Sequence, residues 1–246
     1  REKFPQIYAA GIRSLHRFPE VTAHIDLPGL TVLSLKRHAA WLLDEMRPLV
    51  RRGQLVMMGC QYAASHGLCS DEESDLLASQ VSMDILRNEF GCEVNSFFPQ
   101  ESPYHQQSPL IMDRIGARNL ILMTPDWKRP FRTRGLAGGE IAFYPADIWG
   151  CQLDTLEEFY DAHEDGDFVM TGGDFELLGN VQPFVDKIAE LAKKGKIIEW
   201  MTVERYEREV GIRDRFDTPT PFGQAVEDRR PSPSFSRWVG DPEDIL

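Results

Sequence analysis

The clearest fold signal in this chain is the pentapeptide Leu55-Val56-Met57-Met58-Gly59. A short apolar run that ends at a glycine predicts a fully buried strand of a parallel sheet. An amphipathic helix is predicted directly before it, from Ala39 to Val50, with apolar residues near helical spacing and Gly53 just beyond its end. A helix followed at once by a buried strand indicates an α/β fold.

The same alternation continues along the chain. A helix is predicted from Ser70 to Phe90, because Ser70 can cap its N-terminus, acidic residues follow in its first turn and Gly91 ends it. The other predicted elements are strand Asn95–Pro99, helix Ser108–Ile115, strand Asn119–Met123, strand Phe168–Thr171, helix Val181–Lys194 and strand Ile197–Trp200. Strands that alternate with helices need crossover connections, which predicts a parallel sheet covered by helices.

Polar, glycine-rich or proline-rich turns follow the predicted strands, at 61–70, 100–108, 124–139 and 172–180. In an α/β barrel these strand ends form the face that carries the active site. A doubly wound open sheet is the alternative, but no glycine-rich phosphate-binding loop opens a helix, so nucleotide binding is not predicted. We predict a barrel domain over residues 1–212, then a proline-rich extension or the start of another region at 213–246.

The composition is that of a soluble globular protein, with 42% hydrophobic residues and a formal charge of -12. The negative charge argues against a nucleic-acid or anionic membrane partner. No apolar stretch approaches the roughly 20 residues that a membrane-spanning helix needs, and we expect a cytoplasmic location. The four cysteines contain no CxxC pair, so we expect buried thiols and no structural zinc site.

Two acidic motifs follow predicted strands. Glu101 lies within Phe97–Tyr104, flanked by prolines and aromatic residues, and Asp174 and Glu176 lie within Gly172–Asn180. A glycosidase needs two carboxyl groups at one bond, a nucleophile and a proton donor. Acidic residues at strand ends are more often helix caps or solvated loop charges. The spacing alone therefore leaves the catalytic pair as one of several interpretations.

At these residues the chain resembles glycoside hydrolase family 57. Gly53–Cys60 resembles the family motif GQLELVGG, Phe97–Glu101 resembles its WLPE motif, and Asp174–Gly179 matches its Asp-x-Glu-x-x-Gly segment. The order and spacing agree, and the resemblance covers roughly residues 54–195.

The resemblance implies an incomplete seven-stranded (β/α) barrel that hydrolyses or transfers α-glycosidic bonds of an α-glucan-type polysaccharide with retention. It implies that Glu101 is the nucleophile and Asp174 the general acid/base, with no metal and no cofactor. It also implies that His66 lines the sugar site near the nucleophile. Further substrate contacts are expected from Tyr104, Trp127, Phe175 and Glu176.

The chain departs from the family pattern in three places. The opening strand with its His-Gln-Pro motif is absent, which we interpret as truncation before Arg1, and we expect truncation after Leu246 as well. Val56 stands where the first motif has glutamate. In the second motif phenylalanine replaces Trp and Leu, and Gln100 precedes Glu101. These changes leave the substrate and some of its contacts open.

Two other functions compete. A polysaccharide deacetylase has a related barrel that resembles 65–104, but it needs a metal on one Asp and two histidines, and no histidine follows His66 before His105. A catalytically inactive carbohydrate-binding barrel is the other, because a fold does not determine an activity. Aromatic residues of the predicted loops suit sugar stacking or core packing: Tyr104, Trp127, Phe131, Trp149 and Phe175.

Overall fold

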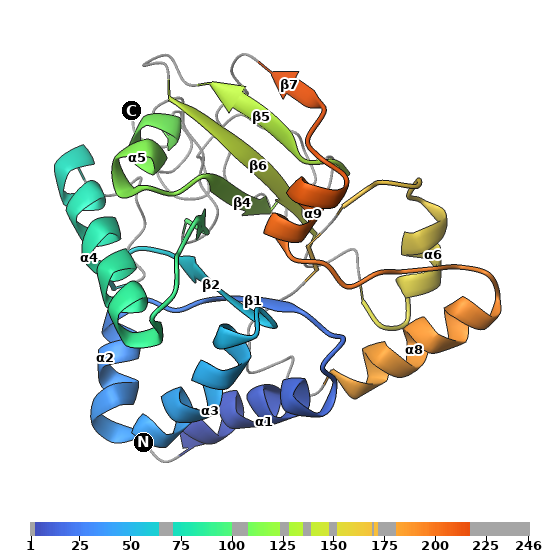
Figure 1. The fold of residues 1–246 in the computed structure, drawn as a ribbon, viewed down its shortest axis with the longest axis horizontal. Coiled ribbons are helices and arrows are strands. Elements are labelled where there is room, and N and C mark those ends of the chain that lie inside the picture. The colour runs from blue at the N-terminus through green and yellow to red at the C-terminus, as the bar shows by residue number, and fades with distance from the viewer. Residues whose placement is uncertain are drawn as a thin grey trace, which may run out of the picture.

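The computed structural model of the chain describes residues 3–63, 71–99, 108–123, 128–134, 139–147, 152–168, 170–171 and 181–216. They form a seven-stranded sheet of order β1-β2-β3-β4-β6-β5-β7. The strands are β1 (Ala23–Asp26), β2 (Leu55–Gly59), β3 (Ser96–Phe97), β4 (Asn119–Met123), β5 (Phe131–Arg134), β6 (Glu140–Ala146) and β7 (Asp214–Phe216). All neighbours pair in parallel except β5 and β6, which are antiparallel. The sheet is open and mostly parallel, which confirms the predicted incomplete barrel architecture (Figure 1).

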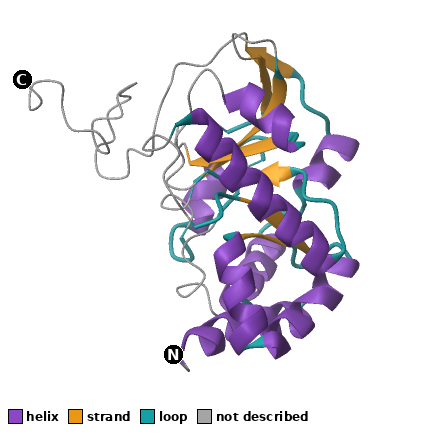
Figure 2. Cartoon of the chain, turned by 90° about the vertical axis from the view of Figure 1, so that its left-hand side faces the viewer, coloured by secondary structure: helices purple, strands orange, loops and turns teal. Residues whose placement is uncertain are grey.

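Helices surround this sheet. They are α1 (Lys3–Arg17), α2 (Gly29–His38), α3 (Ala40–Arg51), α4 (Glu72–Phe90), α5 (Ser108–Ile115), α6 (Leu156–Asp161), α8 (Gln182–Lys193) and α9 (Val203–Glu209). Figure 1 shows α1 to α5 gathered beside β1 to β4, with α6 and α8 on the other side of the molecule. Figure 2, at right angles to this view, shows the helices packed along the strands. No helix in the described part of the chain is long and apolar enough to cross a membrane.

The strands divide their side chains between two apolar clusters. Leu120 and Leu122 of β4 belong to the larger cluster, which includes residues of α1 to α5, whereas Ile121 between them belongs to a smaller cluster. This alternation is the two-residue period of a strand buried on both faces. We call the side of the sheet that carries the smaller cluster the inner face. That cluster consists of Met58, Ile121, Ala142, Tyr144, Ala146, Val203 and Tyr206.

The predicted helices are confirmed to within two residues. Only the start of α4 needs a correction, because its N-cap is Asp71 and not Ser70. The Asp71 carboxylate accepts a hydrogen bond from the Ser74 N–H at 2.9 Å, and this bond lowers the pKa of Asp71. Gly91 ends the helix as predicted, in the left-handed conformation with φ of 63°.

The two strands predicted after Met123 differ from the structure. Of the described residues 168, 170 and 171 within the strand predicted at Phe168–Thr171, Met170 alone pairs, in an isolated parallel bridge to Ala146. The strand predicted at Ile197–Trp200 is wrong, because these residues join no strand. Packing holds this segment instead, with Trp200 against the larger cluster and Met201 against the inner face. A short apolar run shows that a segment is buried, but it does not show that it has a strand partner.

β5 is an element that we did not predict. It lies within 124–139, which we interpreted as a turn, and it pairs antiparallel with β6. Phe131 is buried and stacks on Phe143 with ring centroids 4.4 Å apart, so of the two roles left open for this ring, sugar stacking or core packing, the structure shows core packing. β7 pairs with β5 at 214–216, and residues 217–246 of the proposed extension lie outside the described part.

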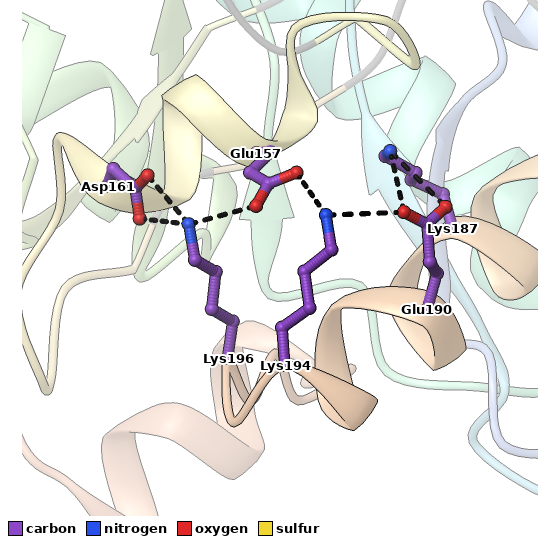
Figure 3. A network of polar contacts seen from close by, with 6 residues as sticks. All are labelled: Glu157, Asp161, Lys187, Glu190, Lys194 and Lys196. Atoms are coloured by element: carbon purple, nitrogen blue, oxygen red, sulfur yellow. Dashed lines mark hydrogen bonds and ion pairs between the residues drawn. The ribbon is translucent and has the colours of Figure 1, made fainter.

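An ion-pair network joins α6 to the end of α8 on the surface (Figure 3). Glu157 pairs with Lys194 at 2.7 Å and with Lys196 at 3.2 Å, and Asp161 pairs with Lys196 at 2.5 Å. The hydrogen bond from Lys194 lowers the pKa of Glu157. Exposed pairs of this kind contribute little stability. The packing of Leu156 and Leu191 in one buried cluster is therefore the main contact between these helices.

Candidate active site

The ends of five parallel strands meet at one edge of the sheet, which we call the carboxyl edge. These strands are β1, β2, β3, β4 and β6. Met170 joins the same edge, because its N–H donates to the Pro145 carbonyl at 3.1 Å and its carbonyl accepts from the Asp147 N–H at 2.8 Å. In α/β barrels this edge carries the active site.

The predicted site residues all lie outside the described part of the chain: Glu101, Asp174, His66, Tyr104, Trp127, Phe175 and Glu176. The points from which their segments start are described. His66 follows β2, and Asp174 stands three residues after Thr171. Glu101 stands two residues after Pro99, which itself lies two residues beyond the end of β3. The nucleophile and acid/base assignments therefore remain predictions, but the segments that carry them leave from the carboxyl edge.

The described starting points of the two acidic segments lie three strand positions apart in the sheet. In the sheet, β4 and β6 separate β3 from the bridge at Met170. Three strand spacings of about 4.8 Å amount to roughly 14 Å. Extended segments of two and three residues span roughly 7 and 10 Å. Segments that start at Pro99 and Thr171 are thus long enough to bring Glu101 and Asp174 to a common point.

β1 places two polar side chains on the inner face, and our sequence reasoning missed both. Asp26 pairs in register with Met58 of the inner face, whereas Ile25 belongs to the larger cluster. His24 and Asp26 therefore both point inward. The sequence pattern that could have found them is the alternation of polar and apolar residues from His24 to Leu27. Over four residues this alternation predicts a half-buried strand only weakly.

His24 connects β1 to α9. The N–H of Val203, the first residue of α9, donates to His24 Nε2 at 3.4 Å. Burial lowers the pKa of His24 to about 4. The imidazole is therefore neutral at pH 7, and the hydrogen bond from Val203 assigns its proton to Nδ1, so that Nε2 is the acceptor. The carbonyl of the same Val203 accepts from the Tyr144 hydroxyl at 3.3 Å, so the start of α9 contacts both β1 and β6.

We expect the stability of the protein to fall between pH 6.5 and pH 4 because of His24. In the unfolded chain the imidazole takes up a proton near its ordinary pKa of 6.5, whereas in the folded chain burial holds that pKa at about 4. The unfolded state thus gains protons first as the pH falls, which lowers the free energy of unfolding. Urea unfolding at pH 7.5 and 4.5 should show a larger loss for the wild type than for His24→Asn. An equal loss of stability in the wild type and in His24→Asn would contradict this role. The control is His38→Asn, on the exposed side of α2, which should lose as much stability as the wild type does.

The end of β2 is tied to the start of α4. The side-chain amide of Gln61 donates to the Asp75 carboxylate at 3.2 Å, and both side chains are buried. Cys60 beside them is a buried free thiol, as expected. Its pKa is raised mainly by burial and also by the negative charge of the Asp26 carboxylate. A protonated thiol is a poor nucleophile. Cys92 is also free, whereas Cys69 and Cys151 lie outside the described residues.

No protein-family model matches the chain, and no curated protein matches it in sequence. Solved structures match the chain in fold. The 4-alpha-glucanotransferase from Thermococcus litoralis has a TM-score of 0.70 and 17% identity over 86% of this chain and 37% of that one. A GH57 branching enzyme from Thermococcus kodakaraensis has a TM-score of 0.62 and 10% identity over 88% and 68%. A polysaccharide deacetylase-type protein from Mycobacterium smegmatis has a TM-score of 0.63 and 16% identity over 87% and 82%.

The chain has the barrel fold of these proteins. This likeness confirms the fold that we expected from the resemblance to glycoside hydrolase family 57. The chain spans 37% of the length of the glucanotransferase. Within the part of the chain that the structure describes, no group of three histidine, cysteine or acidic side chains could hold a metal ion.

Proposed function

We propose that this chain carries the catalytic site of a retaining glycoside hydrolase or transglycosylase that acts on α-glucans. The observation that supports it best is the common origin of the two acidic segments. β3 and the Met170 bridge both end at the carboxyl edge, and the motifs with Glu101 and Asp174 follow directly. The matches to a 4-alpha-glucanotransferase and a GH57 branching enzyme support the choice of substrate class.

In the proposed mechanism the Glu101 carboxylate attacks the anomeric carbon and forms a covalent glycosyl-enzyme. Asp174 gives its proton to the oxygen of the leaving sugar as the glycosidic bond breaks. Asp174 then takes a proton from water or from a second sugar, whose oxygen displaces Glu101. The retaining mechanism requires the two carboxyl groups to lie roughly 5 to 5.5 Å apart. His66, Tyr104, Trp127, Phe175 and Glu176 are proposed to bind the sugar.

The inner face suits this chemistry. Apolar side chains gather there from just beyond the end of β3 (Phe98), the middle of β4 (Ile121) and the bridge to β6 (Met170). A carboxyl group above an apolar floor is held in its protonated form to higher pH, because burial disfavours its charge. A general acid needs such a raised pKa, as in other glycosidases.

A metal-dependent polysaccharide deacetylase is the second candidate. The match to the deacetylase-type protein favours it, because the aligned region covers 82% of that protein. Such an enzyme would hold a divalent metal that activates water for attack on an acetyl group. The two candidates therefore differ in substrate and in their need for metal.

The test is an assay with a soluble α-glucan in the presence and absence of EDTA. We expect new reducing ends or transferred glucan chains at the same rate in both, because two carboxylates do the chemistry without metal. Acetate release from an acetylated polysaccharide that EDTA abolishes would support the deacetylase instead. Binding of the α-glucan without any turnover would indicate a catalytically inactive carbohydrate-binding barrel.

A further inference from the structure

On the basis of the proposed function, we infer that Asp26 is a further substrate-binding residue, whose carboxylate accepts hydrogen bonds from the sugar hydroxyl groups. The sequence motifs did not indicate it. Its position in the sheet does, together with the way in which the chain around it is held.

Asp26 is the last residue of β1 and so lies at the carboxyl edge. β1 neighbours β2, and β2 neighbours β3, after which Glu101 follows. Two strand spacings amount to about 10 Å. Asp26 points to the inner face, because it stands in register with Met58. It thus belongs to the same side of the sheet as the floor of the proposed site.

The chemistry of Asp26 fits a polyhydroxylated ligand. The side chain is half-buried, and its negative charge acts on the Cys60 thiol of the neighbouring strand. A carboxylate has about four acceptor positions, so it can accept bonds from ligand hydroxyls as well as from protein groups. Hydrogen bonds to a charged acceptor are about twice as strong as neutral ones.

The chain beyond Asp26 is held rigidly, which a binding residue requires. The Gly29 N–H donates to the Ser82 hydroxyl of α4 at 3.0 Å, and the Leu30 N–H donates to the Tyr62 carbonyl at 2.9 Å. A Cβ atom at Gly29 would lie 2.9 Å from the Tyr62 ring, so a larger residue at this position would have to displace that ring. His24 is the other polar side chain that β1 turns inward, and its Nε2 accepts a hydrogen bond from the Val203 N–H.

The experiment compares the whole chain with its Asp26→Asn variant, using maltoheptaose as the probe. Calorimetry should show a dissociation constant about tenfold higher for the variant, because a bond to a charged acceptor is replaced by a weaker one. With an α-glucan substrate, KM should rise more than kcat falls. The matched control is Asp84→Asn on the exposed side of α4, where Asp84 pairs only locally with Arg87. This control should bind as the wild type does.

Equal affinity of Asp26→Asn and the wild type would overturn the role of Asp26 and leave the proposed function intact. No binding and no turnover by the wild type would overturn the proposed function, and this inference with it. If thermal unfolding shows that Asp26→Asn does not fold, Asp26→Glu replaces it. That variant keeps the charge but displaces it, and an affinity equal to that of the wild type would then contradict a rigidly placed sugar contact.

Discussion

Glu101→Gln is expected to abolish turnover of an α-glucan and the formation of a covalent glycosyl-enzyme. The amide keeps the shape of the side chain but lacks the charged oxygen that would attack the anomeric carbon. Removal of the nucleophile lowers kcat on the order of 10⁶-fold in another hydrolase with a covalent intermediate. Mass spectrometry of the intact protein after incubation with a slow fluorinated substrate should show the added sugar in the wild type and not in the variant. Glu73→Gln, on the exposed side of α4, should behave as the wild type does.

The partner variant Asp174→Asn separates the two roles. It should slow turnover most for substrates with poor leaving groups, because those need a proton at the departing oxygen. It should still form the covalent intermediate with an activated substrate. Activity of Glu101→Gln near that of the wild type would show that the nucleophile is assigned wrongly, and Glu176 would be the next residue to test.

Phe143→Ala is expected to lower the free energy of unfolding by about 3 to 5 kcal/mol, the usual cost of removing a buried phenylalanine. Phe143 is fully buried in β6 and stacks on Phe131 of β5, with an angle of 17° between the rings. Its loss leaves a cavity and removes the stacking of the two rings across these strands. Urea unfolding followed by circular dichroism measures the change.

The control for this prediction is Leu77→Ala, because the Leu77 side chain is 60% exposed on α4. This change should alter the free energy of unfolding by less than about 0.5 kcal/mol. Phe143→Leu, which refills part of the cavity, should fall between the two. A loss below about 1 kcal/mol for Phe143→Ala would mean that the pairing of β5 with β6 does not depend on this packing.

The centre of the fold could be predicted from the sequence alone. β2 and β4 are continuous apolar runs, and α3, α4 and α5 have clear helical periods and clear ends. These signals are local, because burial on both faces and a capped helix each leave a pattern within a few residues. The two acidic motifs and their order along the chain were also visible in the sequence.

Which strands pair, and the antiparallel direction of β5, became clear only in the folded sheet. β5 is four residues long, so the alternation of Phe131 and Thr133 with arginines is too short to predict a strand by itself. It forms because β6 supplies both a ladder and the ring of Phe143. β1 turns His24 and Asp26 inward because of its register with β2. Hydrophobic periodicity reports whether a residue is buried, but the partner of a strand depends on residues far away in the chain. The motifs of the sequence therefore pointed to Glu101 and Asp174 as the proposed catalytic carboxylates. The sheet showed that their segments start from one edge and that Asp26 faces the inner side of the sheet, because these two facts depend on strand order and register.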